Sequence, residues 1–276
     1  MAEAGTRTGQ RERKPIAALS RVLAALVESE HDSVGVRELA RILNAPPSSV
    51  HRTLAAAQEV SLVSVNAADR WELGWELHRI ASLVGRKNPY RAVAADILAD
   101  LADITGESAL LAVYDPKRLA RMWIATAASR HSVRFVPRLY EWLPAHAGAG
   151  AHAILAHRPS AELDALEQRG LDKFTDTTIT SRARLDQVLD QVRKDGYSIS
   201  RNEVNLGAVG VAAPIKAFTG VMSSLALIIP QQRFTAQMER ELPGRVVGAA
   251  EKLALRVGDP DPRLPGDGPF DGPAGD

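Results

Sequence analysis

The spacing of apolar residues changes within the first 75 residues from a helical period to a strand period. Three helical stretches come first, with apolar residues at Ile16, Leu19, Val22, Leu23, Leu26, Val27, Val36, Leu39, Ala40, Leu43, Val50, Leu54 and Ala57. Steps of three and four place such residues on one side of a helix. The last two stretches are separated by Asn44-Ala45-Pro46-Pro47. Because consecutive prolines cannot continue a helix but can begin one, we predict two helices joined by a short turn, preceded by another helix.

A β-hairpin is predicted directly after these helices. Residues 62–65 and 70–73 alternate in polarity and flank the polar turn Asn66-Ala67-Ala68-Asp69, which is typical of a hairpin. Three short helices followed by a hairpin indicate a winged helix-turn-helix over residues 16–74. About 60 residues are enough for one small hydrophobic core.

The start of the second helix of a helix-turn-helix meets the major groove, where short polar and cationic side chains reach base edges and phosphates. Ser48 and Ser49 can donate to phosphates, Arg52 to a phosphate or guanine, and His51 can contribute one hydrogen bond. Arg37 and Arg70 would neutralise further phosphates. The predicted DNA-binding residues are Arg37, Pro47, Ser48, Ser49, His51, Arg52 and Arg70. The alternative is that they form the solvated face of a small helical domain. The net charge of only +1 means that a local patch would have to bind DNA.

The remainder of the chain has a mixed pattern. Residues 75–88 have helical spacing and end at a proline, which predicts a linker helix that packs on its neighbours or pairs with a second copy. Residues 89–257 contain strand-like runs at 108–114, 122–127, 197–200, 209–215 and 221–229. Helical stretches at 160–169, 182–195 and 235–257 lie between and after them. This order predicts an α+β domain in which helices cover a sheet.

The two ends of the chain have no apolar periodicity. Residues 1–15 are predicted to be a flexible basic arm, and residues 258–276, rich in Gly, Pro and Asp, a disordered acidic tail. No apolar run approaches the roughly 20 residues of a membrane helix, and no leader is visible, so we expect a cytoplasmic protein. The absence of cysteine excludes disulfides, Cys-ligated metals and thiol catalysis.

Several motifs in this order and spacing are similar to those of one family. They are Val36-Arg37-Glu38-Leu39-Ala40, Ala45-Pro46-Pro47-Ser48-Ser49-Val50-His51-Arg52-Thr53-Leu54, Trp71-Glu72-Leu73-Gly74, Pro144-Ala145-His146, Asp195-Gly196-Tyr197, and Glu203 followed by Gly207 and Ala212-Ala213-Pro214-Ile215. Over residues 16–257 the chain resembles IclR-type transcriptional regulators. The resemblance implies a winged helix, a linker helix and a GAF-like domain with an antiparallel sheet flanked by helices. It also implies a small effector that changes DNA affinity, and homodimers or dimers of dimers on palindromic operators.

The presumed effector site departs from the family pattern. Where the family usually has Pro-Leu-His-x-Thr-Ala-x-Gly-Lys-Ala, this chain has Gly148, Ala151 and His152 in place of Thr, Gly and Lys. A frequent Cys is Gly210, and two frequent Ser positions are Ala226 and Ile228. The residues expected at the effector site are His146, Gly148, Ala149, Gly150, Ala151, Glu203, Gly210, Ala226 and Ile228.

The roles of these residues follow from the same comparison. The backbone N–H groups of the loop are expected to bind a ligand carboxylate, and His146 to lie at the pocket mouth. Glu203 would either fix its loop or face the ligand. Without the thiol and the two hydroxyl groups, the pocket offers fewer hydrogen bonds to a ligand. An effector with many oxygen atoms would be disfavoured, since an unpaired buried polar group costs about 1–3 kcal/mol. We therefore expect a larger or more apolar effector than is usual, or a site that no longer responds.

Two other classes of function were weighed. Gly148-Ala149-Gly150 is only a weak match to a dinucleotide fingerprint, and Asp115, Asp195 and Glu203 have no evident nucleophile beside them. His152 and His157 would lie about 140° apart on one helix, which argues against a metal site with His146. We therefore expect no enzyme, metal or cofactor. A DNA-binding regulator whose C-terminal domain only oligomerises is the second hypothesis.

Overall fold

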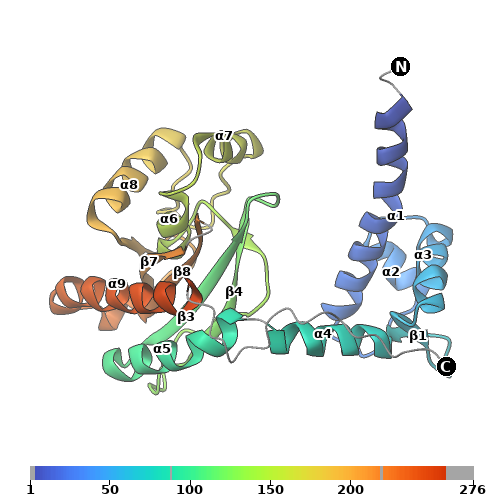
Figure 1. Ribbon diagram of the computed structural model, residues 1–276, viewed down its shortest axis with the longest axis horizontal. Helices are drawn as coiled ribbons and strands as arrows, with labels where there is room; N and C mark the ends of the chain where they lie inside the picture. Colours follow the sequence, from blue (N-terminus) through green and yellow to red (C-terminus); the bar gives the residue numbers. More distant parts are fainter. Residues whose placement is uncertain (1–3, 88, 218–219, 259–276) are drawn as a thin grey trace. The chain divides into compact units, whose positions relative to one another are not determined.

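The computed structural model describes residues 4–87, 89–217 and 220–258 (Figure 1). They belong to two compact units, Met1–Asn88 and Pro89–Asp276, which are described separately. The predicted acidic tail, beyond Gly258, lies outside the described residues, as do the first three residues of the predicted arm.

The N-terminal unit contains three helices, a hairpin and a fourth helix. Its elements are α1 (Ala4–Val27), α2 (Val36–Ile42), α3 (Pro47–Glu59), β1 (Val63–Val65), β2 (Trp71–Leu73) and α4 (Trp75–Lys87). One buried cluster, which includes Val22, Leu39, Leu54 and Trp71, joins the first three helices to the hairpin. This arrangement confirms the predicted winged helix-turn-helix.

Helix α1 begins earlier than predicted. Residues 4–15, which we interpreted as a flexible arm, continue α1, and Pro15 lies inside this helix. Proline inside a helix removes one backbone hydrogen bond and crowds the carbonyl group four residues before it, but extending an existing helix is much easier than starting one. The polar segment has no apolar period, and apolar periodicity reports packing rather than helicity, so the sequence pattern missed these turns.

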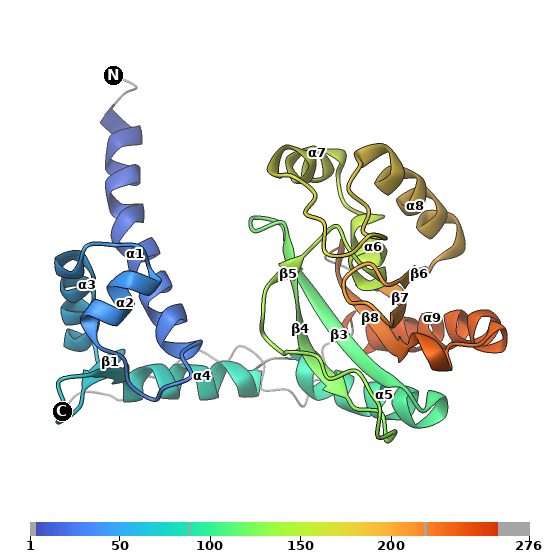
Figure 2. The same cartoon turned by 180° about the vertical axis from the view of Figure 1, so that it is seen from behind.

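The C-terminal unit is one antiparallel sheet with helices on both faces (Figures 1 and 2). Its helices are α5 (Pro89–Thr105), α6 (Ala149–Leu155), α7 (Ser160–Arg169), α8 (Arg182–Asp195), the 3₁₀ turn η1 (Gln231–Arg233) and α9 (Ala236–Gly258). The strands are β3 (Ser108–Asp115), β4 (Ala120–Ala127), β5 (Leu143–Pro144), β6 (Ser198–Arg201), β7 (Ala208–Ala217) and β8 (Gly220–Pro230), in the order β5-β4-β3-β8-β7-β6. The predicted α+β class is confirmed. Strand β5 was not predicted, because two residues are too few to show a period.

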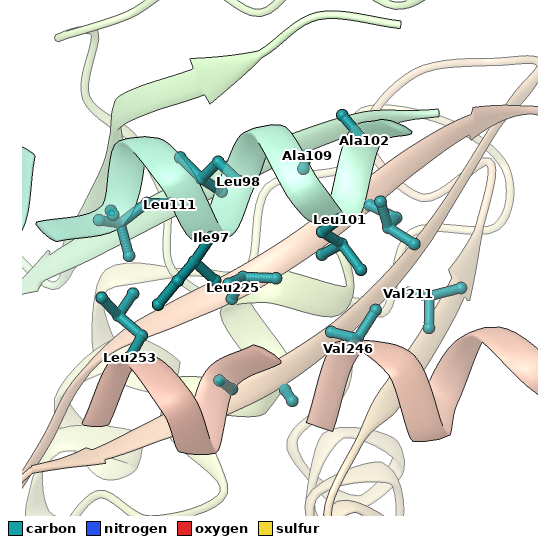
Figure 3. Close-up of a cluster of buried hydrophobic side chains, with 14 of the residues drawn as sticks. Ile97, Leu98, Leu101, Ala102, Ala109, Leu111, Val211, Leu225, Val246 and Leu253 are labelled. Atoms are coloured by element: carbon teal, nitrogen blue, oxygen red, sulfur yellow. The ribbon is translucent and has the colours of Figure 1, made fainter. Parts of the chain in front are cut away.

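Two hydrophobic cores lie on opposite faces of this sheet. Ala109 and Leu111 of β3 pack with α5 and α9, as Figure 3 shows for the first core. Leu110 and Ala112 of the same strand pack on the other face with α6, α7 and α8. Because both faces are covered, the central strands are nearly continuous apolar runs.

Gly74 provides a test of the N-terminal unit. A Cβ at this position would lie 2.1 Å from the Ser61 carbonyl oxygen and 2.8 Å from the Leu62 carbonyl carbon. We therefore expect Gly74→Ala to lower the free energy of unfolding by roughly 2–4 kcal/mol, measured by urea denaturation. Gly85→Ala is the control, since a Cβ there meets nothing within 4 Å and alanine favours a helix by about 1 kcal/mol. Equal effects of the two substitutions would contradict this packing.

Candidate functional site

The first half of α3 presents polar side chains to solvent. Pro47 is the first residue of the helix, where the missing N–H of proline costs nothing. Val50, Leu54 and Ala57 are buried and fix the rotation of the helix. As a result Ser48, His51 and Arg52 are exposed, while Ser49 is half-buried.

An aromatic contact holds this part of α3 against the hairpin. The rings of His51 and Trp71 lie edge to face, with centroids 6.1 Å apart and planes at 87°. Trp71 is buried and exchanges two backbone hydrogen bonds with Val34, of 2.8 and 2.9 Å. The exposed start of α3 is therefore tied both to the hairpin and to the segment before α2.

The two flanking arginines differ. Arg37 of α2 is exposed. Arg70 donates from Nη2 to the Ser33 carbonyl oxygen at 2.7 Å and pairs with Glu38 at 3.2 Å. Arg70 was predicted to neutralise a phosphate, but in the structure its charge is engaged within the protein. Sequence spacing could not reveal this because Ser33 and Arg70 are 37 residues apart.

The C-terminal unit contains a cavity of about 340 Å³ on the α6 face of the sheet. Its lining residues are Arg121, Trp123, Phe135, Val136, Pro137, Arg138, Glu141, Leu143, Gly148, Ala149, Gly150, Ser200, Glu203, Val204, Asn205, Ala208, Gly210, Ala226 and Ile228. They include seven of the nine residues predicted for the effector site. The exceptions, His146 and Ala151, are buried elsewhere.

The loop before α6 does not present its first two amides to a ligand. The N–H of Gly148 donates to Glu203 Oε2 at 3.0 Å, and that of Ala149 donates to Ser200 Oγ at 2.8 Å. We expected these amides to bind a ligand carboxylate, but the protein occupies them with its own side chains. The Glu203 side chain thus holds the loop before α6 rather than its own loop, and it also lines the cavity.

Two glycines allow this close packing. A Cβ at Gly210 would lie 3.1 Å from Ser200 Oγ and 3.2 Å from Ala149 Cβ. At Gly150 it would lie 3.1 Å from Cη2 of Trp123 and 3.2 Å from Ser224 Oγ. The absent side chain at position 210 is therefore not simply empty volume, because Ser200 and Ala149 approach each other there.

His146 in the loop and His152 in α6 are held by contacts within the protein. His146 Nε2 is 3.0 Å from the Asp172 carbonyl oxygen, and its ring stacks on Phe174, so it does not lie at the mouth of the cavity. His152 is fully buried and its Nε2 donates to the His146 carbonyl oxygen at 3.0 Å. In the described part of the chain, no group of three potential metal ligands gathers.

Burial shifts the pKa values of His152 and Glu203 in opposite directions. It lowers the pKa of His152 to about 4 and raises the pKa of Glu203 to about 7. Their 3.4 Å contact is therefore not an ion pair near neutral pH, since His152 is uncharged there.

Sequence reasoning missed Arg121 and Trp123. Because they are two residues apart on β4, their side chains share the face of the sheet that carries α6. Only 4% of Arg121 and 5% of Trp123 is exposed. The Arg121 guanidinium lies over the Trp123 ring, 4.7 Å from the centroid. An arginine two residues before a buried tryptophan in a strand was the available signal, because alternate residues share a face.

Glu203→Gln tests the buried carboxyl group. Since the pKa of Glu203 is raised from 4.5 to about 7, ionisation costs the folded protein stability as pH rises through this window. Glutamine keeps an oxygen for the Gly148 N–H but has no charge. We expect the stability of E203Q relative to wild type to increase by roughly 1–3 kcal/mol between pH 4.5 and pH 8. Urea denaturation at both pH values measures this, with the exposed Glu251→Gln as control. A difference that does not change with pH would contradict it.

The chain is similar to known proteins over most of its length. The family described as bacterial transcriptional regulator IclR, C-terminal, matches residues 84–255. The chain is 30% identical over 247 residues to the HTH-type transcriptional regulator BhcR of Paracoccus denitrificans, covering 87% of both proteins. It is 28% identical over 235 residues to the transcriptional repressor IclR of Escherichia coli, covering 84% of this chain and 86% of that one.

Solved structures share the fold. An IclR transcriptional regulator from Alicyclobacillus acidocaldarius has a TM-score of 0.76 at 22% identity, covering 88% of this chain and 98% of the other. An IclR homologue from Microbacterium hydrocarbonoxydans, solved in complex with 4-hydroxybenzoate, has a TM-score of 0.75 at 20% identity, covering 88% and 99%. Within the described residues, no helix is long and apolar enough to cross a membrane.

Proposed function

This chain belongs to the IclR family of bacterial transcriptional regulators, and from this premise we propose that a small-molecule effector in the C-terminal cavity changes its affinity for a DNA operator. The relatives are named as regulators and repressors, so the protein is a DNA-binding regulator and not an enzyme. We propose that it acts in the cytoplasm.

The observation that carries the DNA-binding part is the exposed start of α3. Ser48, His51 and Arg52 project from a helix whose opposite face is packed in the core, as base and phosphate contacts require. Arg37 on α2 is a further phosphate-contacting candidate. Arg70 is better assigned to holding the hairpin, because Ser33 and Glu38 already bind its guanidinium.

The cavity supports the effector part. Its walls are mainly apolar, with a few polar groups, which is the usual character of a small-molecule site. A protein of the same fold was solved with 4-hydroxybenzoate bound. The polar side chains missing at Gly210, Ala226 and Ile228 favour a second candidate, in which the C-terminal unit only oligomerises.

We also propose that the regulator acts as a dimer or dimer of dimers on a palindromic operator. Helix α4 exposes Ile80 and Val84, with 40% and 61% of each residue accessible, and these two residues are four apart and share one face of the helix; the exposed Trp75 lies on the opposite side. An apolar face of this kind is suited to pairing with a second copy.

Arg52→Ala tests the DNA interface. We expect it to weaken binding to DNA flanking its own gene by about tenfold or more, because a base or phosphate contact is worth about 1–3 kcal/mol. If Arg52 contacts a phosphate, the slope of log affinity against log salt should decrease in magnitude by about 1. Gel-shift titration measures both effects, and the exposed Arg240→Ala of the C-terminal unit is the control. Unchanged affinity for R52A would refute the assignment.

A thermal-shift screen of the full chain against small acids and aromatic metabolites tests the effector. A ligand that binds only the folded protein must raise its melting temperature. We expect such a ligand also to change the affinity for DNA, and Ala208→Trp, which fills the cavity wall, to abolish both effects. No stabilising ligand in the screen would favour the purely oligomerising alternative.

A further inference from the structure

The effector cavity contains a buried cation that the protein itself does not neutralise. Arg121 is 4% exposed, although buried arginines are normally paired. Its Nε and Nη1 have no hydrogen-bond partner among the described residues. The remaining nitrogen, Nη2, makes one long bond of 3.4 Å to the Ala147 carbonyl oxygen.

The carboxylates of the cavity do not compensate Arg121. Among the described residues, no carboxylate oxygen pairs with this guanidinium, and burial alone lowers the pKa of Arg121 to about 10. Glu203 directs its Oε2 to the Gly148 N–H instead. Arg121 therefore stays a cation at neutral pH, with most of its N–H donors unused.

A tryptophan ring packs against this guanidinium. Trp123 lies below it at 4.7 Å, and Gly150 leaves room for the indole ring. A flat guanidinium presents parallel N–H groups, which suit the two oxygens of a carboxylate.

From this arrangement we propose that Arg121 binds the carboxylate of the effector, and that the effector is a monocarboxylate with an apolar body. This inference rests on the proposed function of the cavity. Phe135, Val136, Leu143 and Ile228 offer apolar surface to the body of such a ligand. A second carboxylate on the ligand would further oppose ionisation of Glu203, whose pKa is already raised to about 7, and would compete with Glu141 for Arg138, which pairs with Glu141 at 3.4 Å, so it would gain less than the first.

The same surface contains a matched pair for comparison. Arg118 also lies over a tryptophan, 5.0 Å from the centroid of Trp142. Its side chain is 55% exposed and pairs with Asp115 at 3.4 Å, and it does not line the cavity. Arg118→Met therefore makes the same chemical change at a hydrated and paired arginine.

Two measurements on the full chain test the proposal. In the first, Arg121→Met should raise the melting temperature of the ligand-free protein, because methionine replaces an unpaired buried charge with an apolar side chain of similar length. R118M should leave it unchanged or lower it. A lower melting temperature for R121M alone would mean that Arg121 is a structural residue, and would overturn the proposal.

In the second measurement, calorimetry compares benzoate with benzamide, and hexanoate with hexanamide. For at least one pair we expect wild type and R118M to bind the acid about tenfold or more tighter than the amide. R121M should lose this preference. Terephthalate should bind about tenfold more weakly than benzoate. Equal binding of acids and amides, a preference retained by R121M, or no acid binding up to about 10 mM would each overturn the proposal.

The effect of the bound acid on DNA separates this inference from the proposed function. If benzoate binds through Arg121 but leaves gel-shift affinity unchanged, the inference holds and effector control fails. If R121M still responds on DNA to a neutral ligand, effector control holds and the inference fails.

Discussion

The C-terminal unit depends on a sheet that is buried on both faces. Side chains of β8 alternate between the two cores, with Leu225 and Leu227 toward α9 and Ala226 toward α6. Helix packing on each side thus fixes the register, since a slip by one residue would exchange the two faces. In β7 and β8 the large side chains, such as Val211, Leu225 and Leu227, lie on the α9 face, whereas the small residues Gly210, Ala212 and Ala226 lie beneath α6. The cavity is a consequence of this difference in side-chain size.

In the cavity, the protein's own side chains satisfy the loop amides but, among the described residues, do not pair with Arg121. Glu203 and Ser200 satisfy the loop amides, so the loop keeps its conformation without a ligand. Arg121 of β4 lies beside the same loop, where its Nη2 makes one long bond of 3.4 Å to the Ala147 carbonyl oxygen, and its other donors are unused within the described part of the chain. The side chains of Glu203 and Ser200 therefore occupy the amides that a ligand could otherwise bind. The guanidinium of Arg121 remains available to a negatively charged ligand.

The spacing of apolar residues predicted helices and strands better than it predicted which side chains contact one another. The helices expected near 160–169 and 182–195 are present as α7 and α8, because each buries apolar residues at helical spacing. Seven of the nineteen cavity residues were anticipated, and these came from the family resemblance rather than from periodicity. The surroundings of Arg70, His146 and Arg121 could not be predicted. Each depends on which distant segment packs against it, and the spacing of residues within one segment does not contain that information.

The contact between His51 and Trp71 has an evolutionary consequence. The imidazole belongs to the surface that we propose for DNA binding, whereas the indole belongs to the core and to the backbone pairing with Val34. Replacing His51 would remove a side chain that contacts the core residue Trp71. A smaller residue at position 71 would remove the contact that helps to orient α3. The two positions are therefore not independent, and the proposed DNA-binding surface is coupled through this contact to the folding of the N-terminal unit.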